Sequence, residues 1–126
     1  MMIAFVMIAL MGGFVSRYVW MGKYSAQGCA AVAKEGLKSR KMAVEQLLSG
    51  LGMKMVGMWG LSEPEWDFIV LGESDSDMRA RHGALTLTTM STGMFERFQI
   101  LSLLETEEVD DARKTMPGYR APGSSS

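Results

Sequence analysis

Few side chains in this sequence are of the kind that carries out chemistry, and they are spread along the chain. The only histidine is His82 and the only cysteine is Cys29. A metal site needs several such ligands close together, and a nucleophilic thiol needs a neighbouring base. Because His82 lies between Arg81 and Gly83, we expect an exposed helical side chain and no metal site. Cys29 lies in a run of small residues and is expected to be a buried filler, although a thiol near the start of a helix can also be reactive.

The most informative polar residue is Asp67, which follows Trp66 and precedes an apolar run. Side chains alternate along a strand, so Asp67 would share a face with Ile69 and lie opposite Trp66. A carboxylate on an apolar face could bind a ligand or act as a base. The alternative, which we favour, is that Asp67 caps a hairpin at the strand entrance or pairs with Arg97 or Lys23.

Two further aromatic side chains, Tyr18 and Trp20, alternate along an earlier predicted strand and would lie on one face of it. Together with Trp66 and Asp67 they form the predicted ligand-binding set.

A basic pair, Arg40 and Lys41, lies in a predicted helix and could hold an anionic ligand. Basic residues with an acidic neighbour such as Glu45 are more typical of a solvated helix face, and we favour that interpretation. The 14 glycines are scattered at caps and turns, so the sequence predicts no phosphate-binding loop.

The composition excludes several classes of protein. The chain has 126 residues, 48% apolar and 21% charged, which is the size and usage of one globular domain. Its net charge of −1 gives no basic surface for nucleic acid. A single cysteine cannot form an internal disulfide, which fits a reducing compartment, and we predict a cytoplasmic protein. The 13 methionines lack the clustered His or Cys of copper sites and are expected to fill core space, so no cofactor is predicted.

The first segment, from Met1 to Met11, is entirely apolar. It is shorter than the roughly 20 residues that span a bilayer and lacks the positive start of a secretory signal. Three interpretations stay open: an extension outside the folded domain or a misplaced translation start, an apolar segment that packs or touches a membrane through residues 1–11, and a signal peptide. We divide the chain into an apolar extension (1–15), one α/β domain (16–115) and an irregular tail (116–126), and expect the domain to fold without residues 1–14.

The remaining patterns predict four strands and two main helices. Aromatic and β-branched runs are typical of strands, and apolar residues spaced by three and four are typical of helices. Ser25 is a predicted helix N-cap, Gly36 divides the first helix, and Gly52 follows its end. The predicted strands are 16–23, 53–59, 66–71 and 94–104; the predicted helices are 27–34 with 37–49, and 77–90, followed by a short acidic helical turn at 105–113.

The order β-α-β-β-α-β predicts an α+β, ferredoxin-like fold, in which two helices cover one face of a four-stranded antiparallel sheet. The hairpin at 51–71 would be its centre, with Trp66 largely buried, so that Trp66→Ala would cost about 3–5 kcal/mol. The second face has apolar residues as well, and a large exposed apolar patch usually marks an interface. We therefore expect a homodimer formed through this open face.

Four stretches also resemble a known family: Tyr18–Gly28, Ser39–Glu45, Leu51–Met55 and Pro117–Gly123 are similar to the GYD-domain proteins. These are small bacterial proteins that resemble the dimeric α/β-barrel superfamily. The chain departs from the family where Pro64-Glu-Trp-Asp67 stands in place of the usual Gly-x-Tyr-Asp. The resemblance implies the ferredoxin-like fold and dimerisation. It implies no particular reaction, since the family has no generally established one.

Two functions remain. The first is a non-catalytic dimeric module whose open face forms the dimer and leaves a small apolar pocket for an unidentified ligand. The second is a cofactor-free monooxygenase or isomerase with a pocket on the open face, as in some dimeric α/β-barrel relatives. Such an enzyme would depend on Asp67, Tyr18 and Trp20 alone, so we favour the binding module.

Overall fold

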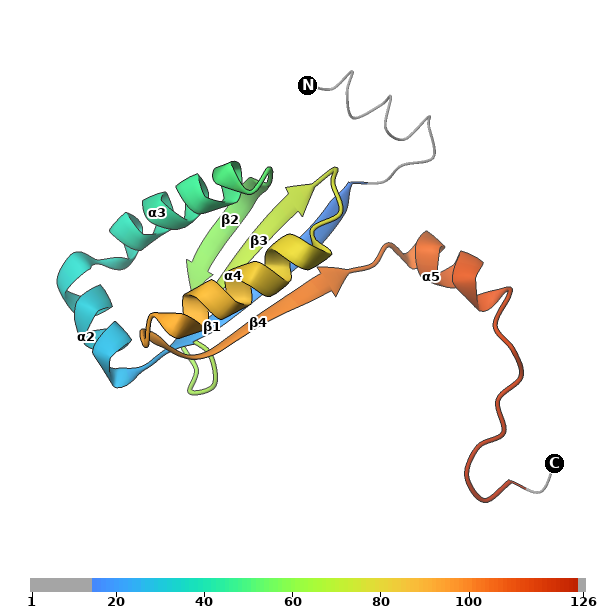
Figure 1. The fold of residues 1–126 in the computed structure, drawn as a ribbon. Helices are drawn as coiled ribbons and strands as arrows, with labels where there is room; N and C mark the ends of the chain where they lie inside the picture. The colour runs from blue at the N-terminus through green and yellow to red at the C-terminus, as the bar shows by residue number, and fades with distance from the viewer. Residues whose placement is uncertain (1–14, 125–126) are drawn as a thin grey trace.

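The computed structural model describes residues 15–124, which form one four-stranded sheet with helices packed on one side of it (Figure 1). Figure 1 also shows α5 and the following tail extending away from the sheet beyond the end of β4. The elements in chain order are β1 (Ser16–Tyr24), α2 (Ala26–Glu35), α3 (Leu37–Gly50), β2 (Lys54–Gly60), β3 (Phe68–Ser74), α4 (Arg79–Ser91), β4 (Phe95–Leu103) and α5 (Thr106–Arg113).

The sheet is antiparallel throughout, with the strand order β2-β3-β1-β4. This is the order of the ferredoxin-like plan, so the predicted fold class is confirmed. In register, Trp20 of β1 lies opposite Val70 of β3 and Ile100 of β4. The two inner strands are therefore β3 and β1, and β1 pairs with β3 on one side and β4 on the other. The predicted central hairpin is central only in β3, because β2 forms an edge of the sheet.

Local signals at the first helix agree with the prediction. The Ser25 hydroxyl accepts a hydrogen bond from the Gly28 amide at 3.1 Å, which makes Ser25 the N-cap of α2. Gly36 has φ +94°, a backbone conformation that side chains disfavour, and it separates α2 from α3. The α2 helix also packs very closely on the start of β4: a Cβ at Gly28 would lie 2.0 Å from the carbonyl oxygen of Met94. A glycine is therefore required at this contact.

The end of α3 is a Schellman motif. Gly52, with φ +81°, donates from its amide to the Ser49 carbonyl, and the Met53 amide donates to the Leu48 carbonyl. The side chains of Leu48 and Met53 are both buried. This apolar pair closes the motif and starts β2 in a fixed direction.

One face of the sheet is covered by α3 and α4 and forms the core. Its β1 side chains are Tyr18, Trp20 and Tyr24, each less than 10% exposed. The helices add apolar side chains to them, Leu48 from α3 and Leu85 from α4. The covered face is therefore rich in aromatic rings, and aliphatic side chains of the helices pack against these rings.

The other face of the sheet, which we call the open face, carries side chains of the opposite parity. Its apolar members are aliphatic apart from one tryptophan, and none of them falls in the buried class. Trp59, which lies over Gly57, is 54% exposed. The apolar residues of the open face are Val19, Met21, Trp59, Ile69, Leu71, Leu101 and Leu103.

The loop between β2 and β3 differs from the prediction. The strand β3 begins at Phe68, so Trp66 lies in the loop and is only partly buried. The expectation that Trp66 is a core residue is therefore wrong. The reason is that the Asp67 amide donates to the Gly22 carbonyl as the chain enters the ladder, which leaves Trp66 just outside it.

Among residues 15–124, no helix is long and apolar enough to cross a membrane. The interpretations of residues 1–11, membrane contact included, fall outside the described part of the chain.

Candidate functional site

Two adjoining cavities lie on the covered face, one beside α2 and one between α3 and α4. Their volumes are about 300 Å³ and about 210 Å³. Both are lined by Arg40, Thr92 and Phe95. We call the two together the aromatic cleft. The sequence predicted a pocket on the open face, whereas these two cavities lie on the covered face.

The floor of the aromatic cleft is a layer of rings from three strands. Tyr24 of β1 lies with its ring centroid 5.3 Å from that of Phe68 and 5.1 Å from that of Phe95. Trp20 lies 6.1 Å from Phe98 in an edge-to-face arrangement. Rings at these separations support one another. The cleft therefore has a rigid apolar floor before any ligand enters.

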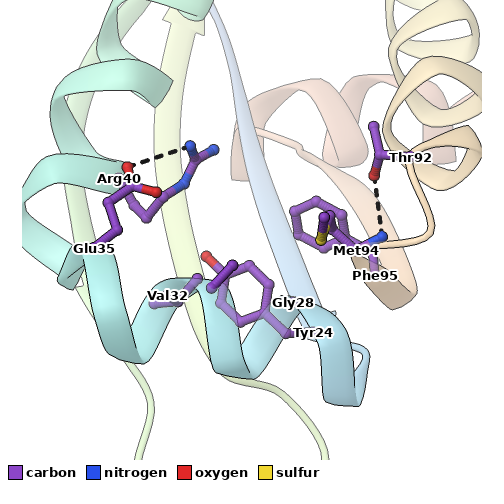
Figure 2. Close-up of a pocket in the computed structure, with 9 residues that line it drawn as sticks. Tyr24, Gly28, Val32, Glu35, Arg40, Thr92, Met94 and Phe95 are labelled. Atoms are coloured by element: carbon purple, nitrogen blue, oxygen red, sulfur yellow. Dashed lines mark hydrogen bonds and ion pairs between the residues drawn. The ribbon is translucent and has the colours of Figure 1, made fainter.

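One wall of the cleft carries a cation, Arg40 of α3. It shares its face of α3 with Val44 and Leu47, which line the same cavity. The Arg40 side chain is about one-third exposed and lies 3.7 Å from Glu35, longer than a charge-assisted hydrogen bond (Figure 2). In Figure 2 the guanidinium is drawn higher in the view than Tyr24, on the side of the ring that carries the hydroxyl. The cleft thus combines an apolar floor with one loosely paired positive charge.

The Tyr24 hydroxyl is the second polar group of the cleft. Burial raises the pKa of Tyr24 above its usual value, and the nearby Arg40 guanidinium offsets part of this increase. The hydroxyl therefore stays protonated at neutral pH and is available as a hydrogen-bond donor.

His82 lies beside the cleft, inside the core, and the prediction of an exposed position is wrong. It is 7% exposed, and its Nε2 accepts a hydrogen bond from the Trp20 indole Nε1 at 3.3 Å. The ring of Tyr18 meets it edge-on at 4.6 Å. Burial lowers the pKa of His82. The prediction relied on the adjacent residues Arg81 and Gly83, whereas helical residues three or four apart, and not adjacent ones, share a face.

The predicted ligand-binding set is divided by the structure. Tyr18 and Trp20 both lie on the covered face, and Trp20 lines the second cavity. Trp66 and Asp67 lie in the loop at one end of the sheet, outside the cleft lining. The four side chains therefore do not form one site on the open face.

Asp67 has a structural role in the loop. Its carboxylate accepts a hydrogen bond from the Tyr24 amide at 2.8 Å, where the β1–β4 register shifts. This agrees with the favoured interpretation of Asp67 as a cap. The cations expected to pair with it bind elsewhere: Lys23 donates to the Pro64 carbonyl, and Arg97 pairs with Glu65.

Two other predictions need comment. Arg97 places its guanidinium 4.6 Å from the Trp66 ring centroid, so Trp66 packs on a cation at the surface.

Cys29 is exposed on α2, and the expectation of a buried filler is wrong. The cause is that its neighbour Gly28, not Cys29, forms the close contact with β4.

The prediction placed Arg40 only as one half of a basic pair and favoured a solvated face for it, although a signal that separates Arg40 from Lys41 exists. The apolar residues Leu37, Val44 and Leu47 are spaced along one side of α3, and Arg40 falls at the interval between them. A cation within an apolar stripe differs from one on the polar side, such as Lys41, which is exposed. Treating the two residues as one basic pair hid this difference.

A family comparison covers the whole of this site. A model of the GYD domain matches residues 18–112. The chain belongs to the GYD-domain family. The resemblance seen in the sequence is thereby confirmed. No curated protein and no solved structure gives a significant match to this GYD domain.

The chemistry available in the GYD domain is limited. Within the part of the chain that the structure describes, no group of three His, Cys, Asp or Glu side chains is placed to hold a metal ion. The polar groups of the cleft are the Arg40 guanidinium, the protonated Tyr24 hydroxyl, the Glu35 carboxylate and the threonines of α4. This set can orient a ligand, and it pairs no nucleophile with a base.

Proposed function

We propose that this GYD domain is a homodimeric binding module that holds a small, largely apolar molecule in the aromatic cleft. The observation that carries the proposal is the preformed layer of Trp20, Tyr24, Phe68, Phe95 and Phe98 under adjoining cavities. Ligand sites in proteins are typically apolar cavities with a few polar groups that fix orientation.

Binding is favoured over catalysis by the state of the polar groups. Tyr24 is protonated at neutral pH, because burial raises its pKa. The Nε2 atom of His82 is occupied by the Trp20 indole. Asp67 is engaged by the Tyr24 amide and lies outside the lining of the cleft. A cofactor-free enzyme would need one of these groups as an acid or base that is free to act.

The dimer part of the proposal rests on the open face. Its aliphatic side chains include Leu101 at 38% and Leu103 at 43% exposure. A second copy of the same face would cover them, and a two-fold pair buries the same patch on both copies. Because the cleft is on the opposite side of the sheet, dimerisation leaves it accessible.

Binding in the cleft is tested with N-phenyl-1-naphthylamine, a neutral apolar dye that fluoresces on leaving water. We expect saturable binding with one site per chain. Val44→Phe places a larger side chain in the cleft and should reduce the affinity at least about fivefold, since overpacking excludes the ring. Val56→Phe, at an exposed position of β2 that lines neither cavity, is the matched control. Equal affinity in the two variants and the parent would contradict a site in the cleft.

Dimerisation is tested separately by light scattering. We expect a dimer mass for the parent and a monomer mass for Leu101→Glu, because a buried unpaired carboxylate strongly opposes association. Leu87→Glu changes a 75%-exposed leucine on α4 in the same way and should remain dimeric. A monomer mass for the parent at all concentrations would exclude the proposed dimer.

A further inference from the structure

We infer that the ligand of the aromatic cleft is a monocarboxylic acid, with its apolar body on the ring layer and its carboxylate on Arg40. The inference rests on the proposed function and specifies the chemistry of the molecule bound.

Arg40 lies at the junction of the two cavities and lines both of them. A side chain of α3 on the solvated side would reach neither. Its aliphatic neighbours Val44 and Leu47 line the second cavity with it, so a molecule that fills both cavities lies beside the guanidinium. The position makes Arg40 the natural partner of a polar end group.

The guanidinium is only weakly neutralised inside the protein. Glu35 lies 3.7 Å from it, and the same Glu35 oxygen already accepts a hydrogen bond from the Ser39 hydroxyl at 2.9 Å. Charge-assisted hydrogen bonds are shorter, at about 2.7–2.9 Å. Arg40 therefore retains donors for a carboxylate that approaches from the cleft side.

A second donor is close to the same position. Figure 2 shows the Tyr24 hydroxyl on the side of its ring nearer Arg40. The Arg40 guanidinium lowers the pKa of this hydroxyl, against the larger effect of burial, as expected for a nearby cation. A carboxylate can accept from the guanidinium and the hydroxyl together, as each of its two oxygens accepts hydrogen bonds.

The charges of the side chains around Arg40 indicate the charge of the ligand. A cationic ligand would be repelled by the guanidinium. A dianion such as a phosphate ester would face one cation with the Glu35 carboxylate beside it, and burying an uncompensated charge is costly. A monoanion with an apolar body matches both the single cation and the ring layer.

The test compares an acid with its neutral amide by titration calorimetry, using 4-phenylbutanoate and 4-phenylbutanamide. We expect the parent to bind the acid about tenfold more tightly than the amide, the size of effect of a hydrogen bond to a charged group. Arg40→Gln should remove this preference, because the acid then loses the cationic donor of the cleft. Lys41→Gln makes the same charge change at the next residue, which is exposed, and should leave both affinities within about twofold.

Two further variants guard against a loss of fold in Arg40→Gln. Glu35→Gln removes the competing carboxylate and should raise the affinity for the acid a few-fold, which widens the preference for the acid over the amide. Arg40→Lys keeps the charge without the fork of donors and should give an intermediate preference.

The outcomes separate this inference from the proposed function. Equal binding of acid and amide, unchanged in Arg40→Gln, overturns the monocarboxylate while the binding module stands. If neither compound binds and the neutral dye does not bind either, the proposed function fails together with this inference. If the dye binds and neither compound does, the cleft binds other apolar molecules and the monocarboxylate is overturned.

Discussion

The two faces of the sheet are both apolar, but they are apolar in different ways. The covered face carries rings such as Trp20 and Phe68, each 3% exposed. The open face carries aliphatic side chains and Trp59, which is 54% exposed and lies over Gly57. Rings are large and rigid, so helices that rest on them leave gaps, whereas a face of shorter aliphatic side chains is smoother. The first face is suited to enclose a small molecule and the second to meet another surface.

The sharpest test of this difference exchanges one tryptophan on each face for alanine. Trp20→Ala should cost about 3–5 kcal/mol of the free energy of unfolding, because it opens a core cavity and removes the indole that donates to His82. Trp59→Ala should cost about 1 kcal/mol or less, since half of that side chain already meets solvent. Urea unfolding in the Leu101→Glu background, where dimer dissociation does not contribute, measures both. Similar losses would mean that the open face is part of the monomer core.

A smaller effect is expected where α2 closes against the covered face. Gly28→Ala would bring a Cβ to 2.0 Å from a backbone oxygen and should cost about 1–3 kcal/mol, because the backbone must shift.

Gly83→Ala in α4 is the matched control, since nothing lies within 4 Å of its Cβ position. It should stabilise the protein by about 0.5–1 kcal/mol through helix propensity. Thermal and urea unfolding measure the two variants side by side. A neutral Gly28→Ala would show that α2 is free to move away from β4, and that the first cavity is not fixed.

The smallest expected effect is a pH dependence of the free energy of unfolding, caused by His82 on the covered face. Burial lowers the pKa of His82 in the folded protein below its unfolded value of about 6.5. Between the folded and the unfolded pKa, the unfolded chain binds more protons than the folded protein. The contribution of His82 to the free energy of unfolding is therefore fully present above about pH 6.5 and is lost as the pH falls toward the folded pKa.

The variant His82→Gln should show a shallower decline in the free energy of unfolding between pH 7 and pH 5 than the parent. The groups packed on the imidazole are the rings of Tyr18 and Trp20, which meet it edge-on. Equal slopes in the parent and the variant would assign the pH dependence to the carboxylates of the surface.

The fold was predictable from the sequence because its signals are local. Ser25 caps a helix, Gly36 interrupts one, and the alternation from Ser16 to Tyr24 marks a strand, each through the backbone or side chain of a few neighbouring residues. The resemblance to the GYD-domain family added to these local signals, and the family model matches residues 18–112.

The candidate site was less predictable because it depends on distant contacts. The roles of Arg40 and His82 are set by residues of other elements, Tyr24 and Trp20, which the spacing along one helix does not reveal. Trp66 was misplaced for a related reason: the point at which the chain joins the ladder is fixed by the bond from Asp67 to Gly22, between segments 45 positions apart in the sequence.

The register shift in β2 has a consequence for aggregation. Between Met55 and Gly57 the pairing with β3 slips by one residue and Val56 is left exposed. A bulge bends an edge strand, which makes it a poor template for an extended chain from another molecule. The opposite edge, β4, presents nine residues from Phe95 to Leu103. Newly made copies that pair before folding is complete would therefore be expected to join along β4.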